Sequence, residues 1–408
     1  MPLKIKLFIK KSCRRLTILG WLLMIFLLII AVRLWMGTVC SFLSFNEPVK
    51  AKTLVVEGWV EDYALKNAMD LYKRDHYKHL VITGLPLVHF EDYVIFPSTA
   101  AAAAAVMRKY GFKDSIYQAV IPSTVFIDRT YNTGVATRMI MSKHPEWGKS
   151  FNIYSVGVHS RRTHLMFERA FGSDYDIGII ADTDRTFDPS HWWHTSIGFR
   201  NVSNEFVAWL YVSVFFHPEY TNFKKKLEIG YYTDSIHKER KAEDAFFADS
   251  NKSPLEKDSV KDFRGLYWFP VKYNYRVKAK FDPDTVTPVF GMATNTARKP
   301  EYRIFGHVIF KIHDTLCKLT VYQNMKFRND PRWKNFLFIP FRDKTNGITT
   351  HAGGRYLDTE IPVSDSMILD FNKAYNPYCA YAERWSCPLV PMENRLNVSI
   401  SAGVKEYK

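Results

Sequence analysis

The chain has 408 residues, of which 47% are hydrophobic and 15% aromatic, and it carries a formal net charge of +15. This length is sufficient for two ordinary domains, and the apolar content allows each of them to bury a core. No basic and aromatic motif of a nucleic-acid module accompanies the positive charge, so we expect no nucleic-acid partner.

The first residues combine a basic block with an apolar run. Residues 1–15 contain six lysines and arginines and no acidic residue, and residues 16–32 are uncharged. We predict a transmembrane helix at 16–36, with Arg33 and Trp35 at its interface end. The positive-inside rule then places a single pass in the inner membrane, the N-terminus in the cytoplasm and the bulk of the chain in the periplasm. A cleaved signal peptide is the alternative, although its apolar run is usually shorter.

After a linker at 37–50, short β-branched runs alternate with helical stretches. Such runs are typical of strands that are buried on both faces of a parallel sheet. The order βαβαβ predicts a doubly wound, Rossmann-like α/β domain over 51–222. We predict strands at 53–57, 79–83, 117–121, 151–158 and 176–181, and helices at 61–75, 98–110, 132–144, 161–171 and 202–216.

Beyond a lysine-rich junction at 221–228 the alternation ends. Aromatic and β-branched residues now come in short runs separated by proline and glycine, which is typical of hairpins. Residues 223–408 are therefore interpreted as a mostly-β domain, and the whole chain as α/β with an N-terminal transmembrane helix. We predict strands at 266–271, 275–281, 302–312, 318–323 and 336–341, and one helix at 234–248.

Polar residues gather where the predicted parallel strands end. In an open α/β sheet, ligands bind beyond the carboxyl ends of the strands. Helix N-termini at this edge expose N–H groups that can hold an anion together with a histidine and an arginine. Each residue also has a structural explanation, as a helix cap or a buried core residue. The candidate ligand-binding residues are Glu57, Gly58, Thr83, Gly84, Asp128, Asn132, Thr133, His159 and Arg162.

Several motifs of known chemistry are missing from the sequence. It contains no G-x-G-x-x-G after the first strand, no P-loop and no G-x-S-x-G elbow. The five cysteines show neither a C-x-x-C pair nor Cys/His metal spacing, so we expect no cofactor and no metal. In an oxidising periplasm Cys379 and Cys387 either form a disulfide with each other or remain as two buried free thiols.

The run Asp128–Thr133 (DRTYNT), followed by Ser155 and then His159-x-x-Arg162, resembles the YdcF/SanA/ElyC group of bacterial envelope proteins. The resemblance covers residues 52–216. It implies a Rossmann-like domain behind a membrane anchor, with a role in envelope biogenesis or barrier function.

The C-terminal half resembles a second family, an uncharacterised bacterial domain of unknown function, over residues 229–407. The resemblance rests on FRGLYWFP at 263–270, FIPFRDKTNG at 338–347, DFNKAYNPYCAY at 370–381 and CPLVPMENRL at 387–396. Charged and polar residues stand among the aromatics of these motifs and form either a buried salt-bridge lattice or the lining of a pocket. The candidates are Arg342, Asp343, Arg355, Asp370, Asn372, Glu393 and Arg395.

The function that we expect is a membrane-anchored factor of cell-envelope biogenesis or barrier function. Its α/β domain binds or processes a phosphorylated ligand, either lipid-linked or nucleotide-type. The expected partners are the inner membrane and an anionic envelope precursor or phospholipid headgroup. A non-catalytic periplasmic scaffold or binding protein is one alternative, and a nucleotide-cofactor-dependent transferase is another. The sequence does not decide whether the protein is an enzyme.

Overall fold

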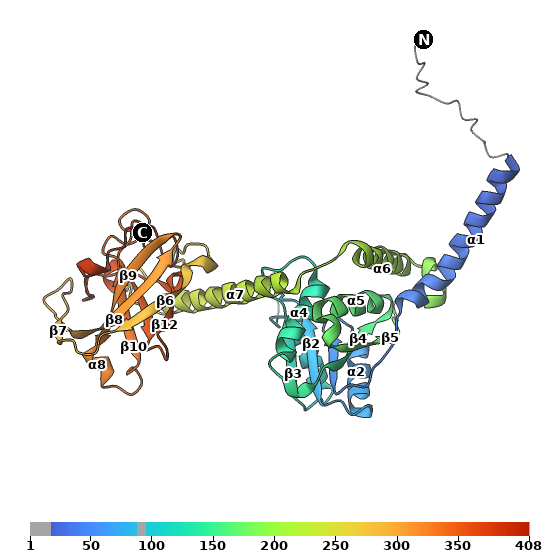
Figure 1. Ribbon diagram of the computed structural model, residues 1–408, viewed down its shortest axis with the longest axis horizontal. Helices are drawn as coiled ribbons and strands as arrows, with labels where there is room; N and C mark the ends of the chain where they lie inside the picture. Colours follow the sequence, from blue (N-terminus) through green and yellow to red (C-terminus); the bar gives the residue numbers. More distant parts are fainter. Residues whose placement is uncertain (1–17, 88–94, 408) are drawn as a thin grey trace, which may run out of the picture. The chain divides into compact units, whose positions relative to one another are not determined.

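The computed structural model describes residues 18–87 and 95–407. Contacts divide the chain into two compact units, Met1–Glu228 and Ile229–Lys408 (Figure 1). The basic block before residue 16 and the start of the predicted transmembrane helix lie outside the described residues. The first unit contains an apolar helix and a parallel sheet, and the second an antiparallel sheet, which confirms the predicted fold class.

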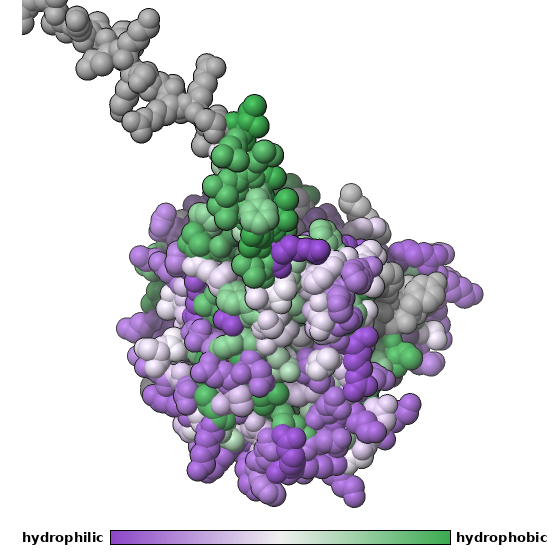
Figure 2. Space-filling model, turned by 90° about the vertical axis from the view of Figure 1, so that its right-hand side faces the viewer, coloured by the Kyte–Doolittle hydropathy of each residue, from purple (hydrophilic) through white to green (hydrophobic). Residues whose placement is uncertain are grey.

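Helix α1 (Ile18–Leu43) is long and apolar enough to cross a membrane, by its length and composition. Figure 2 shows it as a green apolar helix rising from a mostly purple, hydrophilic body. Its last residues Val39, Cys40 and Leu43 are buried against the rest of the first unit. The helix therefore continues beyond the predicted end at residue 36, because these three side chains find apolar partners there. The first half of the predicted linker is helical.

Five parallel strands form the centre of the first unit, in the order β3-β2-β1-β4-β5. All five residues of β1 are buried, as expected for the central strand of a sheet that is covered on both faces. Each strand begins and ends within two residues of its predicted first and last residues. The strands are β1 (Thr53–Glu57), β2 (His79–Gly84), β3 (Ile116–Val120), β4 (Ser150–Val156) and β5 (Asp176–Asp182).

Helices cover both faces of this sheet. Tyr154 of β4 belongs to the apolar cluster formed with α2 and α3, whereas Phe151 of the same strand packs on Phe167 and Phe171 of α5. The helix α6 begins six residues before the predicted start at 202, because the Thr195 side chain caps it. The helices are α2 (Asp62–Arg74), α3 (Thr99–Lys109), α4 (Arg129–Met141), α5 (Ser160–Phe171) and α6 (Ser196–Phe215).

Helix α7 (Tyr220–Ala248) begins before the boundary between the units and continues into the second one. The predicted junction at 221–228 therefore lies within a continuous helix, and the boundary between the two units falls at the end of this junction. Lysine and glutamate are good helix formers. Nζ of Lys224 lies 3.9 Å from Oε1 of Glu228, and ion pairs at this i,i+4 spacing support a helix. The charged run thus belongs to the exposed side of a helix, and the backbone does not break there.

The second unit is an antiparallel half-barrel in the order β11-β10-β9-β8-β6-β12, with β7 paired to β8. The predicted strand at 266–271 is wrong, since Trp268 makes only an isolated bridge with Val404 and Pro270 cannot donate to a ladder. β7, β11 and β12 were not predicted. The strands are β6 (Arg276–Pro283), β7 (Phe290–Gly291), β8 (Glu301–Ile312), β9 (Thr315–Asn324), β10 (Phe336–Phe341), β11 (Arg355–Glu360) and β12 (Ser366–Asp370).

Candidate ligand-binding site

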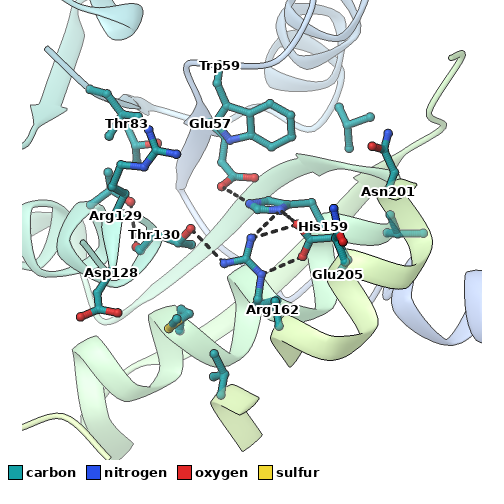
Figure 3. Close-up of a pocket in the computed structure, with 18 of the residues that line it drawn as sticks. Glu57, Trp59, Thr83, Asp128, Arg129, Thr130, His159, Arg162, Asn201 and Glu205 are labelled. Atoms are coloured by element: carbon teal, nitrogen blue, oxygen red, sulfur yellow. Dashed lines mark hydrogen bonds and ion pairs between the residues drawn. The ribbon is translucent and has the colours of Figure 1, made fainter. Parts of the chain in front are cut away.

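A cavity of about 720 Å³ lies in the first unit at the carboxyl ends of β1, β2 and β4 (Figure 3). Its volume is within the range of small-molecule sites. Its wall combines the residues after these strands, the first turns of α3, α4 and α5, and one side of α6. Seven of the predicted candidates line it, namely Glu57, Thr83, Gly84, Asp128, Thr133, His159 and Arg162.

The two glycines of the candidate set serve close packing. The amide of Gly58 donates to the carbonyl of Thr83 at 2.9 Å, and a Cβ at Gly58 would collide with that carbonyl. A Cβ at Gly84 would lie 2.6 Å from the backbone nitrogen of Ala100, in the first turn of α3. These glycines let the ends of β1 and β2 and the start of α3 approach one another.

Asn132 does not reach the cavity. It is fully buried, and its Nδ2 donates to the carbonyls of Ile127 and Asp128, each at 3.0 Å. These bonds hold the turn in which Asp128, with a φ of 50°, precedes the first residue of α4. The prediction that Asn132 is a ligand-binding residue beside Arg162 is therefore wrong, because its Nδ2 is used within its own loop. Thr130 takes that place, since its Oγ1 accepts from Nη1 of Arg162 at 3.4 Å.

Four charged side chains from four different elements meet beside the cavity. His159 lies between two carboxylates: its Nε2 is 3.5 Å from Oε1 of Glu57, and its Nδ1 is 2.9 Å from Oε1 of Glu205. Arg162 donates to both carboxylate oxygens of Glu205, from Nε at 2.7 Å and Nη2 at 3.0 Å. Figure 3 shows this chain of contacts along one wall of the site. With two cations and two anions, the group has no net charge.

The position of Glu57 is fixed by hydroxyl groups. Ser155 donates to its Oε2, and the Thr163 hydroxyl donates to its Oε1 at 3.2 Å. The residue is 3% exposed, so its carboxylate has little contact with water. A buried carboxylate needs such donors and a cationic neighbour to stay ionised.

The electrostatics of the group favour its fully ionised form. Burial alone would lower the pKa of His159, but the nearby Glu57 and Glu205 outweigh burial and raise this pKa to about 9. Burial would likewise raise the pKa of Glu205, yet His159 and Arg162 lower it to about 2. The pKa of Glu57 is also lowered, because His159 offsets the cost of desolvation. At neutral pH His159 is therefore an imidazolium.

Sequence reasoning missed Glu205, which lies on α6 and is separated from Arg162 by 43 residues. Glu205 is the one acidic residue of α6, and an isolated carboxylate in an apolar helix is the signal that could have found it. Asn201 and Asn204 of the same helix and Asp184 after β5 also line the cavity and were missed.

Arg129, the first residue of α4, lines the same cavity. It is exposed, and within the described part of the chain the structure gives its guanidinium no hydrogen-bond or ion-pair partner. Its charge is therefore available to a ligand, unlike that of Arg162. As for metals, residues 18–87 and 95–407 contain no cluster of three or more His, Cys, Asp or Glu side chains that could hold an ion.

The seven candidates of the second unit do not meet in one pocket. Arg355 and Asp343 form an ion pair at 2.8 Å with both side chains completely buried, which is the lattice interpretation. Asp370 and Asn372 bind Tyr232 of α7. The remaining three belong to neither group. The Glu393 carboxylate accepts a hydrogen bond from the Tyr322 hydroxyl, Arg395 is exposed, and Arg342 is half-buried. Of the seven, Asn372 lines a cavity of about 310 Å³.

Cys379 and Cys387 are free thiols that lie side by side. The amide of Cys379 donates to Sγ of Cys387 at 3.3 Å. The hydrogen bond from the Cys379 thiol lowers the pKa of Cys387 and raises that of Cys379. A thiol that ionises readily beside another thiol is poised for oxidation, so the disulfide stays a prediction.

We expect the disulfide in protein that is purified from membranes under non-reducing conditions. Mass spectrometry after alkylation and digestion without reductant should detect Cys379 and Cys387 as a linked peptide pair. Cys317, which is buried elsewhere in the second unit, is the matched control and should be alkylated. Alkylation of all three cysteines would show that the pair remains reduced.

Residues 261–405 match the family described as "Protein of unknown function (DUF1684)", so the second unit contains a DUF1684 domain. The solution NMR structure of an uncharacterized protein from Haloarcula marismortui is 30% identical, with a TM-score of 0.36; the match covers 44% of this chain and 96% of that one. None of the curated proteins compared with the chain matches it. The family match does not extend to the α/β unit, so the resemblance of residues 52–216 to the YdcF/SanA/ElyC group stays a prediction.

Proposed function

We propose that this DUF1684-containing chain is a membrane-anchored factor of cell-envelope biogenesis or barrier function whose α/β unit binds a phosphorylated ligand. The observation that carries the proposal is the ligand-sized cavity at the carboxyl edge of the sheet, where Arg129, the first residue of α4, has no partner among residues 18–87 and 95–407. A free guanidinium beside helical N–H groups suits a phosphate, which carries charge and several acceptor oxygens.

The anchor is α1, whose uncharged residues 18–32 are followed by Arg33 and then by a segment that is buried in the first unit. The positive charges that precede it in the sequence favour a cytoplasmic N-terminus. Both units are then periplasmic, attached by a single pass to the inner membrane. An anionic envelope precursor or a phospholipid headgroup is the kind of phosphorylated molecule that this location offers.

The cluster of Glu57, His159, Arg162 and Glu205 supports binding rather than proton transfer. A general acid or base works best with a pKa near the operating pH. With a pKa of about 9, roughly one His159 in a hundred is deprotonated at pH 7. Both of its nitrogens also face carboxylates. His159 and Arg162 therefore hold the cavity wall in place, and Arg129 is the group that meets the anion.

The proposal predicts that Arg129→Ala weakens phosphate binding at least tenfold, because one charge-assisted contact of this kind is worth about 1.4 kcal/mol or more. Affinities of the full chain in detergent are measured by isothermal titration with two probes, farnesyl diphosphate and uridine diphosphate. The proposal requires that at least one of them bind to the wild-type chain.

Arg74→Ala is the matched control. Arg74 is an exposed arginine at the end of α2, paired with Asp75 and outside the cavity wall, so its removal should leave the affinity unchanged. If neither probe binds, or if Arg129→Ala and Arg74→Ala bind as tightly as the wild type, the phosphate site is not where we place it.

A further inference from the structure

The outer side of α6 is apolar where a soluble protein would present polar residues. Val207, Leu210, Tyr211 and Val214 follow one another at the spacing of a single helical stripe, and each is between 46% and 64% exposed. Phe199 and Phe215, at 55% and 69%, extend the stripe at both ends. These six residues are called the α6 apolar face below. Exposed apolar surface of this extent marks an interaction site.

The α6 apolar face adjoins the membrane anchor. On a neighbouring side of the same helix, Phe206 packs edge-on against Trp35 of α1 with ring centroids 5.4 Å apart, and Trp209 packs on Phe42 at 4.9 Å. Trp35 stands at the end of the exposed apolar part of α1, two residues after Arg33. Trp and Arg at this position are typical of the boundary between membrane and water. In Figure 2 further green surface lies at the base of α1, next to white and purple residues.

We propose that the α6 apolar face docks into the headgroup region of the bilayer that α1 spans. The occupant is lipid because the face continues the surface of the membrane helix itself, and because its aromatic residues Phe199, Tyr211 and Phe215 suit the interfacial region. Arg200, exposed on the same helix, can meet lipid phosphates. The tilt that membrane helices commonly adopt lets α1 and α6 meet the bilayer together.

Docking by α6 identifies the class of ligand, on the assumption that the proposed function is correct. Tyr211 belongs both to the α6 apolar face and to the wall of the 720 Å³ cavity. The cavity therefore adjoins the docked surface. A phosphate held by Arg129 would then belong to a molecule whose apolar tail stays in the membrane, and not to a soluble nucleotide.

Photo-crosslinking of the full chain in native membranes tests the docking. Benzoylphenylalanine is introduced at Val207 or Val214, which are both exposed, so the substitutions do not disturb the core. Lys66, exposed on α2, is the control position. We expect lipid adducts by mass spectrometry at 207 and 214 and none at 66. A crosslink to a second copy or to another protein, or no lipid adduct at either position, overturns the proposal.

The ligand class is tested separately with the chain in lipid nanodiscs. Farnesyl diphosphate should bind at least tenfold more tightly than uridine diphosphate. Equal or tighter binding of uridine diphosphate overturns the assignment of a lipid-linked ligand. Lipid adducts together with no binding of either probe show that the phosphate site has failed while the docking surface stands, so the two failures are distinguishable.

Discussion

Replacing Asp343 with alanine should destabilise the second unit by about 3–5 kcal/mol, because it leaves the buried Arg355 guanidinium without its counter-charge. Both side chains are completely buried, and the pair is 2.8 Å apart. Asp343 also accepts from the backbone amides of Thr345 and Ile400, which would lose their partner. A loss of this size is a large fraction of the stability of an ordinary domain.

The measurement is chemical denaturation of the full chain. Asp343→Asn keeps an acceptor for the two amides and removes only the charge, so its midpoint should lie between those of the wild type and Asp343→Ala. Asp330→Ala is the matched control, since it breaks the exposed Arg332–Asp330 pair, and its midpoint should be nearly that of the wild type. If Asp343→Ala and Asp330→Ala have the same midpoint, the lattice does not stabilise the fold.

The first unit should lose about 2–3 kcal/mol of stability as the pH rises from 7 to 10, through deprotonation of His159. The pKa of His159 is about 9 in the folded protein against 6.5 for an ordinary histidine. The stabilisation is therefore complete below pH 6.5, and it is lost as the pH rises through 9, because the folded state then has to release a proton that it binds more tightly than the unfolded chain does.

His159→Gln is the variant that isolates this effect. We expect it to be less stable at pH 7, but it lacks the titrating group, so its denaturation midpoint should change less between pH 7 and pH 10. The difference between the wild type and the variant removes the contributions of other groups that titrate in this range. Parallel pH profiles for the two proteins would mean that His159 is not protonated between Glu57 and Glu205.

The parallel sheet could be predicted closely from the sequence, because a strand buried on both faces must be a short apolar run whatever surrounds it. β1 shows this most clearly, with all five residues buried. The strands of the antiparallel unit were harder to predict from the sequence. β11 (RYLDTE) and β12 (SMILD) mix apolar and polar residues, so their pairing with β10 and β6 follows from tertiary contacts and not from a local pattern.

The candidate site could be predicted only in part, for the same reason. Rules about strand ends selected Glu57, His159 and Arg162, which do meet. The rules about strand ends do not reach Glu205, which lies on a helix. Its isolated carboxylate marks it as unusual, but its pairing with Arg162, 43 residues away in the sequence, follows from the fold. The prediction for Asn132 was wrong for a different reason. Asn132 does stand at the start of a helix at this edge of the sheet, but its amide donates to the backbone of its own loop and not to the cavity.

The central claim is that a phosphorylated ligand binds at the start of α4. Hydrogen exchange of the full chain, with and without saturating farnesyl diphosphate, tests it most directly because it locates the bound region along the sequence. We expect slower exchange in peptides that cover residues 126–134 and 157–162, and unchanged exchange in residues 261–405. Protection that is confined to the second unit, or that leaves the first turn of α4 unchanged, would contradict the claim.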